Sequence, residues 1–306
     1  MFDRRMIREK FLATLCALAL GSMPAASLRA ATTEKAPSPA AESKAQTQLK
    51  ALVERQRALL ALADKADGDA GLEDLRPKFQ KLVNDYEQYL GDYPMVAAGY
   101  ASYALLLGKP VLGERRRAAA LLLKANELDP DVPLVKNQLG NYLAEEGRPL
   151  EAVSYFLAAI KLAPEEPLYH FQLGHLLSEG RDDFLKGGEW TRTTLDRAMQ
   201  DAFRQAATLA PERIEFTYRY GESFYEVEKP DWEAALIHWR GLETRAKPGV
   251  ERQTVRLHEA NVLLRQGEAA EARALLAAVD EPALQKQKEK LTAQLPAEGK
   301  TEGLKN

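Results

Sequence analysis

The sequence predicts an all-α protein made of stacked helical hairpins, and two observations lead to this prediction. Apolar residues recur at three- and four-residue spacing along most of the chain of 306 residues, which is typical of helices that bury one face. A short series of small, large and proline positions also returns several times in the same order. No run of alternating apolar and polar residues is long enough to favour a strand. The fold class is therefore an α-solenoid, in which similar hairpins pack side by side.

The stretch 133–164 shows the hairpin most clearly. Its first helix carries Gly140 on the inward side and ends near Gly147, where glycine is favoured because the position often needs a positive φ. The second helix has an inward face of small and large apolar residues, namely Ala152, Phe156, Ala159 and Ile160. We expect Phe156 to fill the space between the two helices. One hairpin cannot bury such faces alone, so copies must stack.

Copies of this hairpin are found on both sides of it. Counted from Gly140, the second-helix positions Ala152, Phe156, Ala159 and Pro164 lie 12, 16, 19 and 24 residues downstream. The other copies start at Ala104, Gly174, Gly221 and Ala260, and their second helices are shifted by 2, 13, 2 and 0 residues. Only the closing proline deviates, since it comes one residue late in the fourth copy and is absent from the last. Uniform shifts place the insertions in the turn between the two helices.

At these positions the chain resembles the tetratricopeptide repeat. The family pattern of Leu-Gly, Ala, Phe, Ala and Pro matches Leu139, Gly140, Ala152, Phe156, Ala159 and Pro164. The match departs at Lys136, where the family usually has an aromatic residue, and at Leu143, where it usually has tyrosine. The resemblance covers roughly residues 70–280. It implies a right-handed superhelix of about five to six hairpins with a concave groove that binds proteins or peptides, and it implies no catalysis.

Taken in chain order, residues 1–30 are expected to be a bacterial export signal. A basic start, a short apolar segment and a tail of small residues follow one another, and cleavage is expected after Ala30, with Ala26 as the alternative. The apolar segment is too short to remain as a membrane anchor. A buried amphipathic helix and a twin-arginine signal are the other interpretations of this stretch. The expected location is therefore outside the cytoplasm, in the periplasm or the medium.

The only cysteine, Cys16, lies inside this apolar segment. A lipoprotein signal needs a small residue directly before the modified cysteine, and Leu15 is large. We therefore expect the mature chain to carry no lipid, no disulfide and no thiolate metal site.

The remaining chain is expected to divide into three parts. Residues 31–45 are low in apolar content and predict a disordered linker. Residues 46–295 predict one solenoid domain, closed by a polar capping helix at 282–295 that keeps the end of the stack in contact with water. Residues 296–306 predict a flexible tail.

Charge and spacing argue against nucleic acids, metals, cofactors and enzymatic chemistry. Residues 1–30 contain five basic and two acidic residues, which leaves 37 basic and 43 acidic residues in the mature chain. A mildly acidic protein without a basic run is a poor binder of nucleic acid. His258-Glu259 begins like a zinc-protease motif, but Val262 occupies the position of the second histidine. We therefore expect a protein that is not an enzyme and holds no cofactor.

Candidate partner-binding residues follow from the resemblance, because the first helices of the family line the groove. By match to the repeat they are Asn137, Asn141, Phe171, Gln172, His175, Tyr218, Arg219, Glu222, Tyr225 and Asn261. Asparagine amides can donate to and accept from a peptide backbone, and aromatic rings suit binding hot spots. The alternative is that these are ordinary surface and core residues.

The 13-residue insertion of the third copy, at 180–195, predicts a loop because it contains three glycines. Thr193 or Thr194 is expected to cap the helix that follows. We expect the loop to lie along one edge of the groove and to offer Trp190 or Phe184 to a partner. The alternative is that Trp190 only packs on Phe184.

The function predicted from the sequence is a non-catalytic scaffold that binds peptides or protein segments. The alternative is a structural component of cell-envelope or outer-membrane assembly, because outer-membrane assembly lipoproteins are built from similar repeats. After signal cleavage, neither interpretation includes an integral membrane segment.

Overall fold

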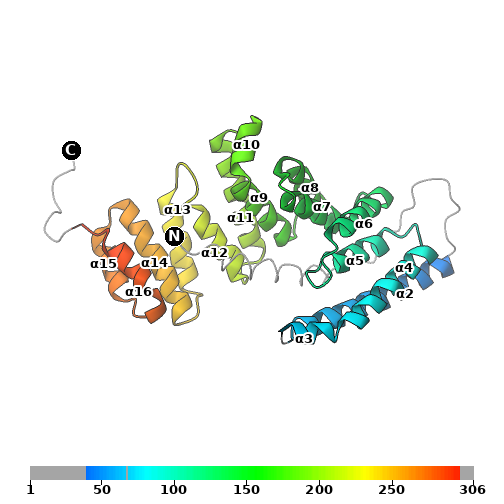
Figure 1. Ribbon diagram of the computed structural model, residues 1–306. Helices are drawn as coiled ribbons and strands as arrows, with labels where there is room; N and C mark the ends of the chain where they lie inside the picture. Colours follow the sequence, from blue (N-terminus) through cyan, green and yellow to red (C-terminus); the bar gives the residue numbers. More distant parts are fainter. Residues whose placement is uncertain (1–38, 67, 297–306) are drawn as a thin grey trace. The chain divides into compact units, whose positions relative to one another are not determined.

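The computed structural model describes residues 39–66 and 68–296 (Figure 1). Within those ranges the chain is helical and contains no β-strand, so the predicted all-α class is confirmed. The chain forms two compact units, of which unit 1 ends at Pro164 and unit 2 begins at Glu165. The predicted export signal at 1–30 and the tail from 297 lie outside the described residues. A single solenoid domain over 46–295 and a right-handed superhelix stay predictions.

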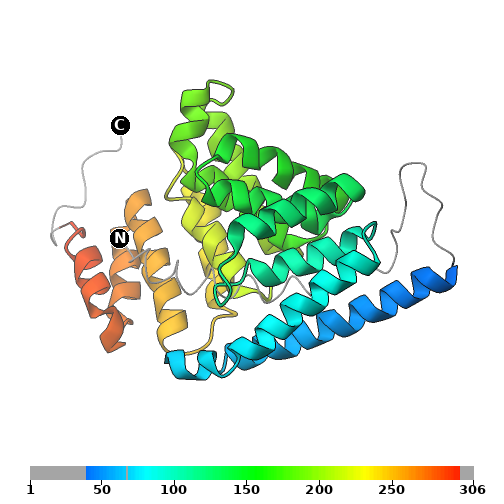
Figure 2. The same cartoon turned by 45° about the vertical axis from the view of Figure 1, so that its right-hand side comes forward.

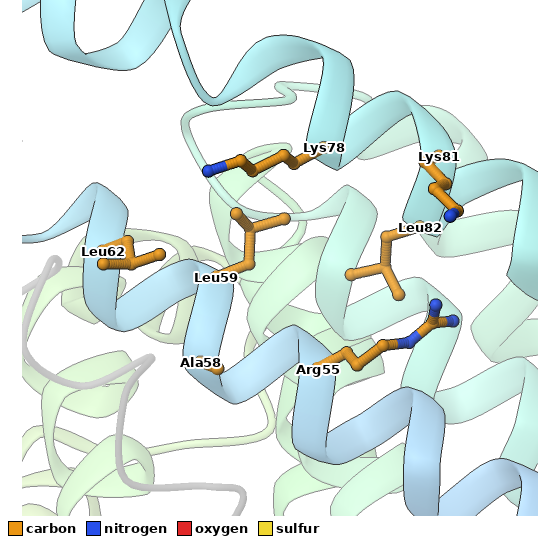
Figure 3. Close-up of a pocket in the computed structure, with 7 residues that line it drawn as sticks. All are labelled: Arg55, Ala58, Leu59, Leu62, Lys78, Lys81 and Leu82. Carbon is orange, nitrogen blue, oxygen red and sulfur yellow. The ribbon is translucent and has the colours of Figure 1, made fainter.

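Unit 1 consists of helices that follow one another in antiparallel pairs (Figure 1). They are α2 (Pro39–Ala63), α3 (Gly68–Glu73), α4 (Arg76–Asp92), α5 (Ala97–Leu107), α6 (Arg115–Leu128), α7 (Pro133–Glu145) and α8 (Pro149–Leu162). A shallow pocket lies between α2 and α4 (Figure 3).

The prediction of a disordered linker over 31–45 is wrong from Pro39 onward, because α2 begins there. Proline is favoured in the first turn of a helix, and the alanines that follow are strong helix formers. The Tyr89 hydroxyl also donates to the Ala45 carbonyl over 3.2 Å, which ties this part of α2 to α4. Composition pointed to disorder, but a contact with a helix far along the chain holds the segment in place.

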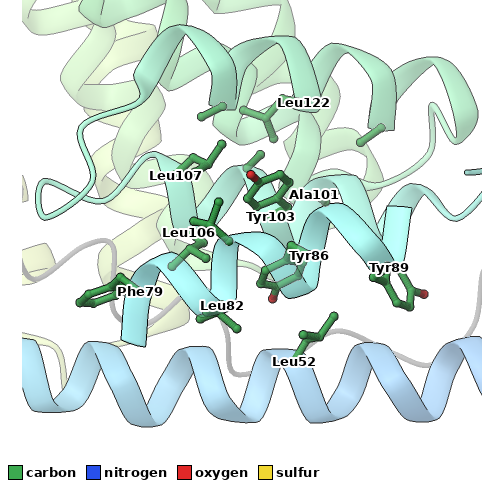
Figure 4. Close-up of a cluster of buried hydrophobic side chains, with 14 of the residues drawn as sticks. Leu52, Phe79, Leu82, Tyr86, Tyr89, Ala101, Tyr103, Leu106, Leu107 and Leu122 are labelled. Carbon is green, nitrogen blue, oxygen red and sulfur yellow. The ribbon is translucent and has the colours of Figure 1, made fainter. Parts of the chain in front are cut away.

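The core of unit 1 lies where α2, α4 and α5 meet (Figure 4). Tyr86 is fully buried and stacks on Tyr103, with ring centroids 5.3 Å apart and planes 8° from parallel. Its hydroxyl donates to Gln56 over 2.6 Å, so this buried polar group is paired. Leu52 and Leu82 pack in the same cluster. Long side chains from three helices thus hold the first hairpin to the next.

Unit 2 has a comparable set of helices, drawn from green to red in Figure 2. They are α9 (Pro167–Glu179), α10 (Arg181–Gly187), α11 (Arg192–Leu209), α12 (Ile214–Ser223), α13 (Trp232–Glu243), α14 (Val250–Gln266), α15 (Ala269–Ala277), the 3₁₀ helix η1 (Pro282–Leu284) and α16 (Gln285–Thr292). The polar helix α16 buries no residue, and Lys288 donates to the Val279 carbonyl over 2.8 Å. This end of the chain is closed by a polar helix, as the sequence predicted.

The repeat register predicted from the sequence is confirmed by close contacts between first and second helices. In three hairpins a first-helix glycine faces a buried second-helix ring: Gly140 and Phe156, Gly174 and Phe203, and Gly221 and Trp239. A Cβ atom on Gly174 would lie 2.7 Å from the Phe203 ring, so only glycine fits without a shift. Gly147 has a φ of 73°, as its position at the end of α7 required.

Candidate functional site

In unit 2, α12 and the turn that follows it bring two predicted tyrosines against a buried histidine of α14. We call Tyr218, Tyr225, Trp239 and His258 the tyrosine–histidine cluster. The Tyr218 hydroxyl lies 2.5 Å from His258 Nε2, and the Tyr225 hydroxyl lies 3.3 Å from Nδ1. The Trp239 indole stacks on the imidazole with centroids 4.2 Å apart and planes 11° from parallel. The ring of His258 is therefore held on both edges and on one face.

These contacts are satisfied together by one protonation state of the histidine. The Tyr225 hydroxyl donates to the His258 carbonyl over 3.3 Å, which leaves its oxygen free to accept from Nδ1–H. Nε2 then accepts from the Tyr218 hydroxyl. Burial lowers the pKa of His258 to about 3, which keeps the ring neutral near pH 7. The cluster is consequently uncharged and hydrogen-bonded, with Trp239 and His258 buried and Tyr218 and Tyr225 partly exposed.

Two further predicted residues lie beside this cluster. Burial raises the pKa of Tyr225, and the nearby Asn261 amide acts in the opposite direction. The charge of Glu222 adds to the rise in the pKa of Tyr218, in which burial is the larger cause. Tyr218, Glu222, Tyr225 and Asn261 are each partly exposed. The structure thus brings four of the predicted partner-binding residues together.

Arg219 has a different environment from the one the sequence predicted. Its guanidinium pairs with Glu226 over 2.9 Å, donates to the Ser178 hydroxyl over 3.0 Å, and lies 4.3 Å from the Phe203 ring centroid. The Ser178 hydroxyl also donates to Glu226 over 2.5 Å. Only 13% of the Arg219 side chain is exposed. These bonds join α9 to α12, so Arg219 contributes to the packing of the unit.

Sequence reasoning missed Ser178, Glu226 and the central role of His258. Ser178 lies one turn after His175 on α9, so helical spacing would have pointed to it. Glu226 lies in the turn after α12, where helical spacing gives no signal. His258 lies one helical turn before the predicted groove residue Asn261, but from the sequence we considered it only as part of an incomplete metal motif.

The prediction that the insertion at 180–195 forms a loop is wrong, because residues Arg181–Gly187 form α10. Phe184 on this helix is fully buried, and Trp190 packs against it edge-on with ring centroids 5.9 Å apart. The glycines at both ends of this segment favour a loop, but the burial of a large aromatic side chain stabilises the helix. Phe184 is therefore a core residue, whereas Trp190 is partly exposed.

Ion pairs fix both ends of the insertion. Arg181 lies 3.6 Å from Asp196 and 3.9 Å from Glu226, and Arg192 pairs with Asp196 over 2.8 Å. The cap of α11 is Thr191 rather than Thr193 or Thr194 as predicted, since Thr191 accepts from the Thr194 amide over 3.2 Å. Asp196 lies within α11 and pairs with both arginines.

The structure is similar to several solved structures, among them a tetratricopeptide-repeat protein and a pilus biogenesis factor. YrrB, a tetratricopeptide-repeat protein with an unusual peptide-binding site, matches with a TM-score of 0.55 and 17% identity over 68% of this chain and 97% of its own. PilF of Pseudomonas aeruginosa matches with a TM-score of 0.55 and 14% identity over 82% of this chain and 99% of its own. The type IV pilus biogenesis factor PilW matches with a TM-score of 0.51 and 13% identity over 81% and 98% of the two chains.

The chain has the tetratricopeptide-repeat fold. No protein-family model and no curated protein matches its sequence. The fold is therefore recognised from the structure and from the repeat register.

Within this tetratricopeptide-repeat fold, two predicted groove residues are buried. Asn137 in unit 1 is 0% exposed, and Phe171 in unit 2 is 1% exposed. Phe171 packs on Phe216 with ring centroids 4.5 Å apart, so the expectation that it faces an open groove is wrong. Neither polar atom of the Asn137 amide has a hydrogen-bond partner among the residues that the structure describes. Both side chains are buried where helices of the same unit pack against one another.

The other predicted residues are partly exposed, namely Asn141 in unit 1 and Gln172 and His175 in unit 2. The His175 ring meets Phe171 and Phe203 edge-on, and burial lowers its pKa to about 3. Whether any of them contacts a partner stays a prediction.

The described residues were also compared with the requirements of a metal site and of a membrane-spanning helix. Over 39–66 and 68–296, no three histidine, cysteine, aspartate or glutamate side chains are placed to share a metal ion. In the same ranges no helix combines the length and apolar character that crossing a bilayer requires.

Proposed function

We propose that this protein is a non-catalytic interaction scaffold that binds a peptide or protein segment over the tyrosine–histidine cluster of unit 2. The observation that carries the proposal is the fixed position of Tyr218 and Tyr225. Both residues are partly exposed, and both hydroxyls are held by the buried His258. A surface that is already ordered loses little conformational entropy when a partner binds.

The chemistry around these rings suits an extended peptide. Glu222 lies between the two tyrosines in sequence, and Asn261 lies beside Tyr225. A carboxylate accepts from backbone amides, whereas an asparagine amide both donates and accepts. Aromatic rings add contact area at low entropy cost, as at binding hot spots. The fold likeness to YrrB, a protein with a peptide-binding site, supports the same class of ligand.

The proposal includes an exported protein with protein partners and without nucleic acid. Export to the periplasm or medium is supported by the sequence of residues 1–30. A role in cell-envelope assembly is the second candidate, and the fold likeness to a type IV pilus biogenesis factor favours it. Fractionation of the native cell would distinguish the two, because a scaffold that acts alone would stay in the soluble periplasmic pool.

Peptides selected from a phage-displayed random library against the whole protein provide the test. We expect Asn261→Ala to weaken binding of the selected peptide by about threefold to tenfold, because it removes one hydrogen bond to the peptide. Tyr225→Phe should weaken binding by a similar factor, because the ring loses the hydrogen bonds that hold it against His258. Gln266→Ala, on an exposed amide of the same helix, and Tyr220→Phe, on the same helix as Tyr218, should bind as the wild type does. Equal loss in all four variants, or selected peptides insensitive to the first two, would refute the proposal.

A further inference from the structure

The pocket between α2 and α4 in unit 1 shares no lining residue with the tyrosine–histidine cluster (Figure 3). It is lined by Arg55, Ala58, Leu59, Leu62, Lys78, Lys81 and Leu82. Its volume is about 270 Å³. Pockets for small molecules run from about 300 to 1,000 Å³ and enclose their ligand, so this open hollow suits one or two side chains of a larger partner.

The floor of the pocket is formed by the edge of the core of unit 1. Leu59 and Leu82 belong to the buried cluster, with 7% and 3% of their surface exposed. Figure 3 shows their side chains pointing from the two helices into the space between them. Leu62 stands beside them with 51% of its surface exposed. An apolar side chain seated here would extend a core that already exists.

The rim of the pocket is basic. Arg55 comes from α2, and Lys78 and Lys81 come from α4, whereas no acidic residue lines the hollow. Arg55 pairs with Asp85 over 2.7 Å, which offsets one of the three charges. Two positive charges thus remain beside the apolar floor, in a protein whose net charge is −3.

We propose that this pocket is a second docking site, which takes apolar side chains of an acidic amphipathic helix from a partner protein. The lining residues of α2 recur at helical spacing, at positions 55, 58, 59 and 62, so the hollow runs along the groove between two helices. A third helix can lie in such a groove with its apolar face inward. Its flanking carboxylates would then meet Lys78 and Lys81.

Charge argues against two other occupants. A symmetric contact between two copies would place the same basic rim on both sides of the interface, and like charges would repel. The polar helix α16 carries Lys286, Lys288 and Lys290, so it does not complement the rim either. A lipid surface is disfavoured because Leu62 is the one lining leucine with substantial exposure, which offers little apolar area to a bilayer.

The probe is a stapled helical peptide, labelled with fluorescein, that carries two leucines on one face and glutamates on both flanks. Binding to the full chain is measured by fluorescence anisotropy at low salt. We expect it to bind at least about tenfold more tightly than the same peptide with lysines in place of the glutamates. Added salt should reduce this preference, because the contacts with the rim are exposed. A third peptide with serines in place of leucines should not bind.

The variants test whether this pocket is the site. Lys78→Glu combined with Lys81→Glu, and separately Leu62→Ser, should each weaken the acidic peptide by about tenfold or more. The matched controls are Lys44→Glu combined with Lys50→Glu, on the same helix as Arg55, and Leu157→Ser, which is 49% exposed on α8. Both controls should bind as the wild type does, with circular dichroism showing equal helicity in all variants.

Four results would overturn the proposal. The acidic peptide does not bind, or the lysine peptide binds equally well. Sedimentation shows a dimer that Leu62→Ser dissolves, which would make the pocket a contact between copies. Vesicles of phosphatidylglycerol bind the wild-type protein but not the Leu62→Ser variant, which would make the pocket a lipid site.

Discussion

At Gly221 the backbone of α12 comes so close to Trp239 that an added Cβ atom would lie less than 3.0 Å from the indole ring. Gly241, on α13, faces open space within 4 Å. We therefore expect Gly221→Ala to lower the free energy of unfolding by about 1–3 kcal/mol, because it overpacks the helix contact. Gly241→Ala should be neutral or should stabilise by up to about 1 kcal/mol, because alanine is the better helix former.

Equilibrium unfolding in urea, followed by circular dichroism, measures both changes. If Gly221→Ala proves as stable as Gly241→Ala, the close contact between α12 and α13 is not formed and the repeat register is incorrect.

Also at the residue scale, His258 makes stability depend on pH. Its folded-state pKa is about 3, whereas an unfolded histidine has a pKa near about 6.5. Below pH 6.5 the histidine is protonated in the unfolded state but stays neutral in the folded state, so the free energy of unfolding falls as the pH is lowered. The loss approaches about 1.4 kcal/mol per pH unit for this one histidine.

We therefore expect His258→Gln to make the decline between pH 6.5 and 4.5 shallower than in the wild type, although the variant is less stable at pH 8. Glu259, whose pKa burial raises to about 7, acts in the opposite direction and adds stability as the pH falls through 7. The difference between variant and wild type isolates the histidine. Urea unfolding at several pH values measures it, and Asn261→Ala should keep the wild-type slope. Parallel curves for His258→Gln and wild type would show that the histidine is not buried in neutral form.

At the element scale, α10 is the part of the molecule that interrupts the repeat. Because Phe184 is fully buried and Arg181 joins the ion pairs of Asp196 and Glu226, the helix contributes to the stability of unit 2. We expect replacement of residues 182–190 by a short turn to lower the melting temperature. Phe184→Ala alone should cost about 3–5 kcal/mol.

Phe184→Leu serves as the control, since it keeps most of the apolar volume and should cost less than Phe184→Ala. Calorimetry of the three variants measures these effects. A shortened protein that melts at the wild-type temperature would show that α10 is a passive insertion.

At the scale of the whole molecule, export predicts a shorter mature chain. We expect the native protein to begin after Ala30 or Ala26 and to carry no lipid. Intact mass spectrometry of the protein from its native cell gives the answer. A mass that retains residues 1–26, or an acylated Cys16, would contradict the prediction.

The sequence by itself determined the hairpin repeat and its register. Each hairpin is nearly contiguous in the chain, so the pairing of Gly140 with Phe156, or of Gly221 with Trp239, follows from local spacing alone. The polar last helix and the positive φ of Gly147 are also local features. The placement of Tyr218 and Glu222 on one side of α12 followed from the same periodicity, whereas Tyr225 lies in the turn after that helix.

Only the tertiary structure decided which of these residues are buried and what holds them. Phe171 lies in the core because Phe216 from another helix covers it, and His258 is central because rings from α12 and α13 close around it. The early start of α2 and the helix α10 depend likewise on distant partners, namely Tyr89 and Asp196. Such contacts join residues 15 to 45 positions apart, and burial and pairing between separate segments leave no period in the sequence.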